Sequence, residues 1–127
     1  MLFGTILVAE DDKMIQRILV RMMKRSGYEG VVYVFEDAES ALACAHEHKG
    51  ELDLILIDTG LHSQGDRAFF EDLRSIAPQT PIVASSGYSE DILRSAKHFE
   101  GCDLAHILCK PFGLQEIKDL LSSLNLT

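Results

Sequence analysis

The 127-residue sequence has no tryptophan, only three prolines and only three cysteines. Cys44, Cys102 and Cys109 are scattered and form no CxxC pair, which argues against a disulfide framework or a cysteine zinc site. We interpret them as small core residues of a protein from the reducing cytoplasm. No apolar run approaches the ~20 residues of a membrane span. The first nine residues lack the basic start of a signal peptide.

Positive charge is also scarce. Twelve Lys and Arg residues stand against twenty Asp and Glu residues, which gives a net charge of −8. A surface of this sign repels phosphate backbones, so direct binding to nucleic acid is not expected. The hydrophobic fraction of 46% and the charged fraction of 25% are typical of a globular protein. The length fits one compact domain spanning residues 1–127.

Two hydrophobic patterns alternate along the chain. Short apolar or β-branched runs predict strands at 5–9, 31–35, 54–57, 81–85 and 105–109. Apolar residues at helical spacing follow each run and predict five helices, with Asp37, Asp66 and Ser89 as expected N-terminal caps of the second, third and fourth. Apolar strands separated by helices indicate an α/β protein with a doubly wound, five-stranded parallel sheet.

Polar residues stand directly after the predicted strands. Glu10, Asp11 and Asp12 follow the first strand, Asp58 follows the third, and Lys110 follows the fifth. The fourth run ends in Ser85-Ser86-Gly87. Each could be an ordinary turn, cap or surface residue. Because the carboxyl ends of parallel strands share one edge, where doubly wound sheets bind ligands, we favour a common site.

These residue types together suit phosphoryl transfer. Neighbouring carboxylates repel one another unless a cation neutralises them, and Mg²⁺ is the hard cation that prefers such oxygen ligands. A lysine and a serine hydroxyl can then bind the oxygens of an incoming phosphate. With an aspartate as the attacking group, the pattern predicts a site that places a phosphoryl group on Asp58.

Four motifs resemble the response-regulator receiver domains of the CheY type: Ile6-Leu-Val-Ala-Glu-Asp-Asp12, Leu54-Ile-Leu-Ile-Asp58, Pro81-Ile-Val-Ala-Ser-Ser-Gly87 and Lys110-Pro-Phe112. The resemblance implies a flavodoxin-like sheet of order 2-1-3-4-5. It assigns Mg²⁺ to Glu10, Asp11, Asp58 and the carbonyl of Gly60. It makes Asp58 the phosphoacceptor, Ser86 the switch hydroxyl and Lys110 the phosphate-binding lysine, with a cis Lys110–Pro111 bond.

The resemblance also implies partners. A sensor histidine kinase or phosphotransfer protein would phosphorylate Asp58, and a further protein, which the sequence does not identify, would read the signal. The module would catalyse only its own phosphorylation and dephosphorylation and is not otherwise expected to be an enzyme.

Several positions depart from the family pattern. Ile107 stands where an aromatic residue is usual and is interpreted as a packed strand residue, and His62 replaces a proline. Gly65-Asp66 reverses the common order, and Gly60 replaces a larger residue. The segment 101–110 is about two residues longer than a typical match. These departures keep a second hypothesis open, a receiver-like adaptor that binds partners independently of phosphorylation.

Two enzyme classes share part of the motif around Asp58. The Asp58-Thr59-Gly60 triplet matches that of aspartic proteases, but Leu61 follows where Ala or Ser is usual, and that family is all-β. Phosphatases of the haloacid-dehalogenase type carry a second aspartate at the position of Gly60. Both classes are therefore disfavoured.

Overall fold

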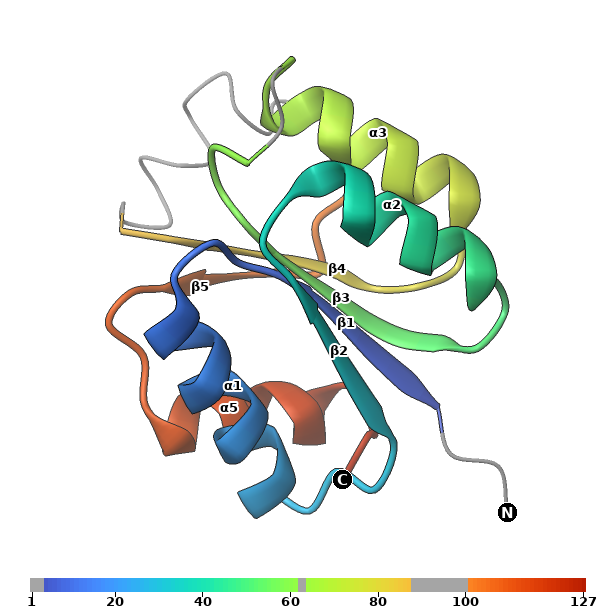
Figure 1. Ribbon diagram of the computed structural model, residues 1–127. Helices are drawn as coiled ribbons and strands as arrows, with labels where there is room; N and C mark the ends of the chain where they lie inside the picture. The colour runs from blue at the N-terminus through green and yellow to red at the C-terminus, as the bar shows by residue number, and fades with distance from the viewer. Residues whose placement is uncertain (1–3, 62–63, 88–100) are drawn as a thin grey trace.

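The computed structural model describes residues 4–61, 64–87 and 101–127 and shows helices on both sides of a five-stranded sheet (Figure 1). The strands are β1 (Thr5–Ala9), β2 (Val31–Phe35), β3 (Leu52–Asp58), β4 (Ile82–Ser86) and β5 (His106–Cys109). The described helices are α1 (Lys13–Arg25), α2 (Ala38–Glu47), α3 (Asp66–Ile76) and α5 (Leu114–Ser123). The helix predicted to begin at Ser89 lies outside the described residues.

All four strand pairs are parallel, and the strand order is β2-β1-β3-β4-β5. This confirms the doubly wound parallel sheet that the sequence predicts and the flavodoxin-like strand order that the resemblance implies. The chain moves from β1 outward to β2, then returns to the other side of β1 for β3, so the strand order reverses between β1 and β3. Ligands bind beyond the carboxyl ends of strands at such a point. The arrangement also excludes the all-β protease fold.

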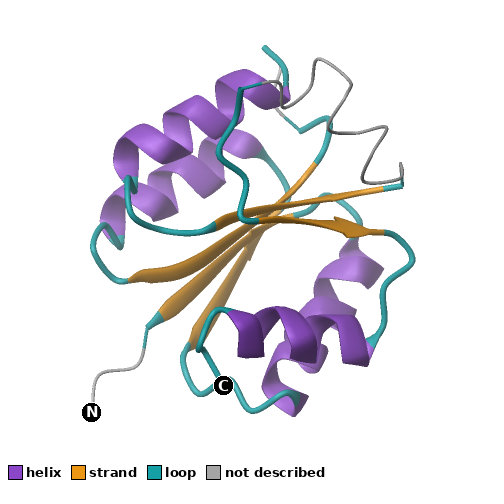
Figure 2. Cartoon of the chain, turned by 180° about the vertical axis from the view of Figure 1, so that it is seen from behind, coloured by secondary structure: helices purple, strands orange, loops and turns teal. Residues whose placement is uncertain are grey.

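The core consists of two layers, one on each face of the sheet, because successive strand residues point to opposite faces. One layer packs beneath α2 and α3 and includes Leu7, Ile57 and Phe69. The other packs beneath α1 and α5 and includes Val8 and Leu121. Figures 1 and 2 show these helix pairs on opposite sides of the sheet. Both faces of the sheet are therefore covered.

Aspartate side chains begin two of the helices. The Asp12 carboxylate accepts backbone N–H bonds of 2.9 and 3.2 Å at the start of α1. Asp37 accepts one of 2.7 Å at the start of α2, which confirms its predicted capping role. The prediction for Asp66 is wrong, because Gly65 precedes α3 and Asp66 is the first helical residue. Its carboxylate makes a different contact, which belongs to the functional site.

Two smaller predictions need correction, the start of β3 and the burial of Cys109. Strand β3 begins at Leu52 rather than at residue 54. Strand β2 forms an edge of the sheet, and its first residue, Val31, is 47% exposed. Cys44 is a core residue as predicted, whereas Cys109, at the end of β5, is exposed. Within the described ranges, no helix is both long and apolar enough to cross a membrane.

Candidate functional site

The carboxyl ends of β1 and β3 bring three carboxylates together. Asp58 is the last residue of β3, and Glu10 and Asp11 directly follow β1. The Glu10 N–H donates to the Phe35 carbonyl at 2.9 Å. This bond extends the pairing of β1 with β2 and fixes Glu10 at the carboxyl ends of the strands. One oxygen from each carboxylate lies within 4.8 Å of the other two. Hard oxygen donors at this separation fit Mg²⁺.

Lys110 adds a positive charge to this cluster. Its Nζ donates to Glu10 Oε1 and to Asp58 Oδ1, both at 3.0 Å. Its backbone N–H donates to the Ser86 carbonyl at 2.7 Å, which ties the end of β5 to the end of β4. The Lys110–Pro111 bond is cis, as the resemblance implies. Three ionised carboxylates and one ammonium leave two negative charges, which a divalent cation would balance.

Burial shapes the electrostatics of the cluster. Glu10 is only 1% exposed, and its desolvation raises the pKa of the carboxyl, with a further contribution from the charge of Asp58. The Asp12 N–H, which donates to Glu10 Oε2 at 3.0 Å, and Lys110 partly offset this rise. Burial alone would lower the pKa of Lys110, but its hydrogen bonds to Asp58 and Glu10 outweigh burial and raise it. Burial therefore makes the ionised form of Glu10 less favourable than it is in water.

Asp66 fixes the loop that follows Asp58, a role that the sequence did not reveal. The Gly60 N–H donates to Asp66 Oδ1 at 2.7 Å. Gly60 has a φ of 85°, in the left-handed region that favours glycine. The same loop is held to β4 by the Thr59 N–H, which donates to the Ser85 carbonyl at 3.3 Å. The backbone of Gly60, whose carbonyl the resemblance assigns to the metal, is thus anchored next to Asp58.

Two buried serines end β4. Ser86, predicted as the switch hydroxyl, is the last residue of the strand. Ser85 is the residue that pairs with Asp58 in the register between β3 and β4, and residues paired in this way point to the same face of a sheet. Sequence reasoning did not single out Ser85, because only the register shows which serine lies beside Asp58.

The departure at Ile107 is a packing feature. Its side chain is 2% exposed and belongs to the core layer beneath α2 and α3, and the residue pairs with Ala84 of β4. This confirms its interpretation as a packed strand residue. An aliphatic side chain fixed in the core cannot act as a rotating aromatic ring at this position.

An apolar groove lies next to the carboxylate cluster. It has a volume of about 320 Å³ and is lined by Ile15, Ile18, Lys110, Pro111 and Phe112. Ile18 is 44% exposed, and the nearby Met14 on the same helix is 70% exposed. Exposed apolar side chains of this size often mark a contact surface for another protein. Because Lys110 lines the groove and also binds Asp58, a protein docked there would reach the cluster.

The raised pKa of Glu10 leads to a prediction about the metal-free protein. An ionised, buried Glu10 destabilises the folded state, and its folded pKa lies above the ordinary 4.5. The free energy of unfolding of the wild type therefore gains from this residue as pH falls through the folded pKa and the carboxyl takes up a proton. Glutamine is neutral at every pH. We expect the stability of Glu10→Gln, relative to wild type, to be highest near neutral pH and to decline toward pH 4.5. Urea unfolding in the presence of a chelator measures this, and a difference independent of pH would contradict it.

Comparison with known proteins gives a consistent result. The model of the family described as "Response regulator receiver domain" matches residues 6–122. The transcriptional regulatory protein CitT of Bacillus subtilis (strain 168) is 28% identical over 116 residues, which cover 91% of this chain and 50% of CitT. The chain spans between 12% and 50% of the length of the curated relatives it matches.

Solved structures share the fold at low sequence identity. The chemotaxis response regulator CheY4 of Vibrio cholerae superposes with a TM-score of 0.81 at 19% identity, covering 97% of this chain and 99% of that one. The receiver domain of the sensor histidine kinase PA1611 from Pseudomonas aeruginosa PAO1 gives 0.79 at 22% identity, covering 96% and 97%. The latter structure has a magnesium ion coordinated in its active site cleft.

Proposed function

Because the chain belongs to the family of response regulator receiver domains, we propose that it accepts a phosphoryl group on Asp58 from a histidine kinase or phosphotransfer protein. Residues 1–127 would act as one receiver domain. The observation that carries the proposal is the contact of Lys110 with both Glu10 and Asp58 at 3.0 Å, beside a third carboxylate, that of Asp11. This is the charge arrangement that phosphoryl transfer to a carboxylate requires.

In the proposed reaction, an Asp58 oxygen forms a bond to phosphorus while the phosphorus–nitrogen bond of a phosphohistidine breaks. The imidazole leaves with the bonding electrons and takes up a proton. Glu10, Asp11, Asp58 and the Gly60 carbonyl would hold Mg²⁺, which would offset the negative charge of the transferring group. Lys110 already contacts Asp58 and would bind a phosphate oxygen with its ammonium group.

Phosphorylation would then change the surface that a partner reads. We infer that Ser86 and Lys110 bind the phosphate oxygens, which draws the end of β4 toward Asp58 and biases a two-state surface. Ile107 is packed in the core, so this switch would not depend on an aromatic ring at its position. The downstream partner is a protein whose identity the chain does not specify.

The buried acid favours this function over a phosphate-independent adaptor. Glu10 carries a raised pKa because of its burial, which destabilises the ionised form. Carboxyl groups with perturbed pKa values are concentrated at functional sites. A buried carboxylate of this kind would serve no function in an adaptor that binds neither metal nor phosphate. The apolar groove of Ile15, Ile18 and Phe112 supports docking of a phosphodonor protein beside Lys110.

The proposed location of the protein is the cytoplasm, where such phosphodonors act. Its free cysteines fit the reducing conditions there.

Incubation with acetyl phosphate tests the proposal. We expect the intact chain to gain one phosphoryl group in the presence of Mg²⁺ and none in the presence of a chelator, as measured by mass spectrometry under non-acidic conditions. A phosphorylated histidine phosphotransfer protein is a second donor with the same expected metal dependence. No modification by either donor, or equal modification with and without Mg²⁺, would overturn the proposal.

A further inference from the structure

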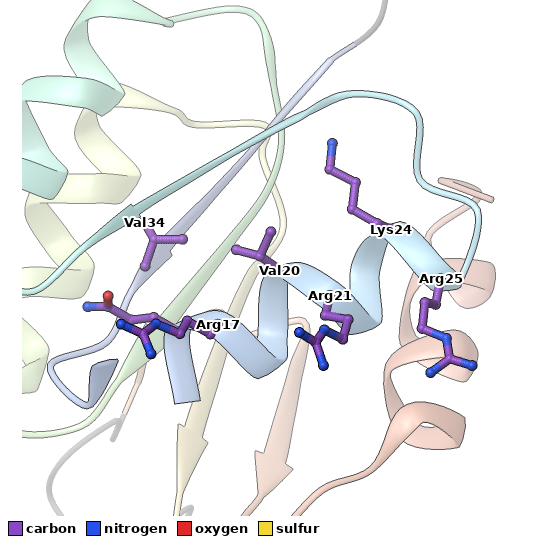
Figure 3. A pocket seen from close by; sticks show the side chains of 7 residues that line it. Arg17, Val20, Arg21, Lys24, Arg25 and Val34 are labelled. Atoms are coloured by element: carbon purple, nitrogen blue, oxygen red, sulfur yellow. The ribbon is translucent and has the colours of Figure 1, made fainter. Parts of the chain in front are cut away.

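A groove of about 550 Å³ runs along the side of α1 that faces β2 (Figure 3). It is lined by Gln16, Arg17, Val20, Arg21, Lys24, Arg25 and Val34. We call it the basic groove. It does not include the carboxylate cluster, and it shares no lining residue with the apolar groove beside Lys110. The basic groove is therefore separate from the site proposed around Asp58.

The charge of α1 is opposite to that of the whole chain. The helix contains five Lys and Arg residues and no Asp or Glu, although the net charge of the protein is −8. Lys24 donates to the Gly30 carbonyl at 3.1 Å. For Arg17, Arg21 and Arg25, the described part of the chain provides no ion pair. Positive charge concentrated on one helix of an acidic protein points to an acidic partner.

The spacing of the three arginines limits what the partner looks like. Arg17, Arg21 and Arg25 recur every fourth residue, which places successive Cα atoms about 6 Å apart along the helix axis. Acidic residues at every fourth position of a second helix have the same spacing, so the two rows can face each other. Such rows of opposite charge set the register and orientation of a docked helix.

The floor of the basic groove is apolar. Val20 of α1 and Val34 of β2 are both half-buried, and Figure 3 shows their side chains between the helix and the strand. Strand β2 is at the edge of the sheet, so this side of the fold is not covered by a further strand. An apolar floor with a basic rim can bind a segment that has both apolar and acidic side chains.

These observations favour a protein segment over a nucleic acid or a lipid surface. A neighbouring hollow, which shares Gln16 and Val34 with the basic groove, is also lined by Glu36 and Asp37, and Glu36 lies 4.0 Å from Lys13. A continuous row of phosphates, from nucleic acid or from anionic lipids, would extend over these carboxylates and be repelled, whereas a short acidic segment can end at Arg17. We propose that the basic groove binds an amphipathic, acidic helix of another protein, with its acidic residues against the arginines and its apolar residues against Val20 and Val34.

Binding of a synthetic peptide tests the proposal with the intact chain. The probe is a helical peptide in which Glu recurs every fourth residue beside a row of Leu, and the reference is a peptide of the same composition in scrambled order. We expect the probe to shift amide resonances of α1 and β2 in NMR titrations. The triple variant Arg17→Gln, Arg21→Gln, Arg25→Gln is expected to bind about tenfold more weakly, because three exposed ion pairs are lost.

A charge-matched control separates this groove from the overall charge. Lys49→Gln, Arg67→Gln, Lys118→Gln removes three exposed positive charges elsewhere and is expected to leave the affinity unchanged. Val34→Thr keeps the shape of the groove floor but replaces a methyl group with a hydroxyl, and we expect it to weaken binding. Melting curves of each variant show that it remains folded.

Several results would overturn the proposal. These are no binding of the probe, equal binding of the scrambled peptide, or equal losses in the two triple variants. Tighter binding of a single-stranded oligonucleotide or of phosphatidylserine vesicles, with the same dependence on the arginines, would assign the groove to a different class of partner. Self-association that is lost on substitution of these arginines would assign it to a second copy of the chain.

Discussion

Asp58→Asn is expected to reduce phosphorylation by acetyl phosphate to background. The amide is a far weaker nucleophile than the carboxylate, and it also removes one of the three charges of the cluster around which Mg²⁺ would bind. Asparagine is nearly the same size and can still accept a hydrogen bond from Lys110 through its carbonyl oxygen. The variant should therefore fold, and the loss should be chemical. Intact-mass measurement after reaction with the phosphodonor shows the effect.

Asp12→Asn is the matched control for this experiment. It removes the same charge from the same edge of the sheet, but Asp12 does not belong to the close carboxylate cluster. Its side chain caps α1, and asparagine is an equally good cap residue. We expect Asp12→Asn to be phosphorylated like wild type. Phosphorylation of Asp58→Asn, or equal loss in both variants, would show that Asp58 is not the acceptor.

Lys110→Ala is expected to destabilise the metal-free protein by about 1–3 kcal/mol near neutral pH, because it removes two charged hydrogen bonds and leaves a buried carboxylate without its partner. The bonds lost are those to Glu10 and Asp58. The folded pKa of Lys110 is raised, so its stabilising effect is fully present below the ordinary value of 10.5 and is lost as pH rises through the folded pKa. Urea unfolding in a chelator measures the difference between variant and wild type.

Added Mg²⁺ distinguishes the site from an ordinary salt bridge. With Lys110 absent, the three carboxylates attract a divalent cation more strongly, so Mg²⁺ should stabilise Lys110→Ala more than it stabilises wild type. Lys118→Ala, on the exposed side of α5, is the control and should change little with or without the metal. If Lys110→Ala were as stable as wild type in chelator, or if Mg²⁺ did not affect it, the proposed role of the cluster would be wrong.

Much of the fold could be predicted because each strand carries its own signal. A run such as 54–57 is apolar at every position, which is typical of a strand buried on both faces, and the following helices show a different period. The candidate site was predictable for a related reason. Glu10, Asp58 and Lys110 each come directly after such a run, and the ends of parallel strands must meet at one edge.

The contact of Asp66 and the position of Ser85 could not be predicted in this way. Asp66 stands at the start of a helix, where capping is the usual role, yet its carboxylate accepts from Gly60 across the loop. Ser85 is adjacent to Asp58 only through the register of β3 and β4. The exposure of Cys109 likewise depends on what packs around the end of β5. The position of Ser85 and the exposure of Cys109 depend on residues that are distant in sequence. The contact of Asp66 depends on which of two nearby backbone groups its carboxylate binds. Local sequence patterns contain neither kind of information.

The amino-acid sequence by itself determined the succession of strands and helices along the chain, the two-sided burial of the central strands and the edge at which the charged residues lie. The first two follow from local periodicity, and the third follows because the carboxyl ends of parallel strands meet at one edge. Only the tertiary structure decided which atoms touch: the two bonds of Lys110, the burial of Glu10 and the groove that joins the arginines of α1 to the edge strand β2. Hydrophobic patterning places elements in layers, whereas contacts depend on strand register and on side-chain directions that a pattern does not encode.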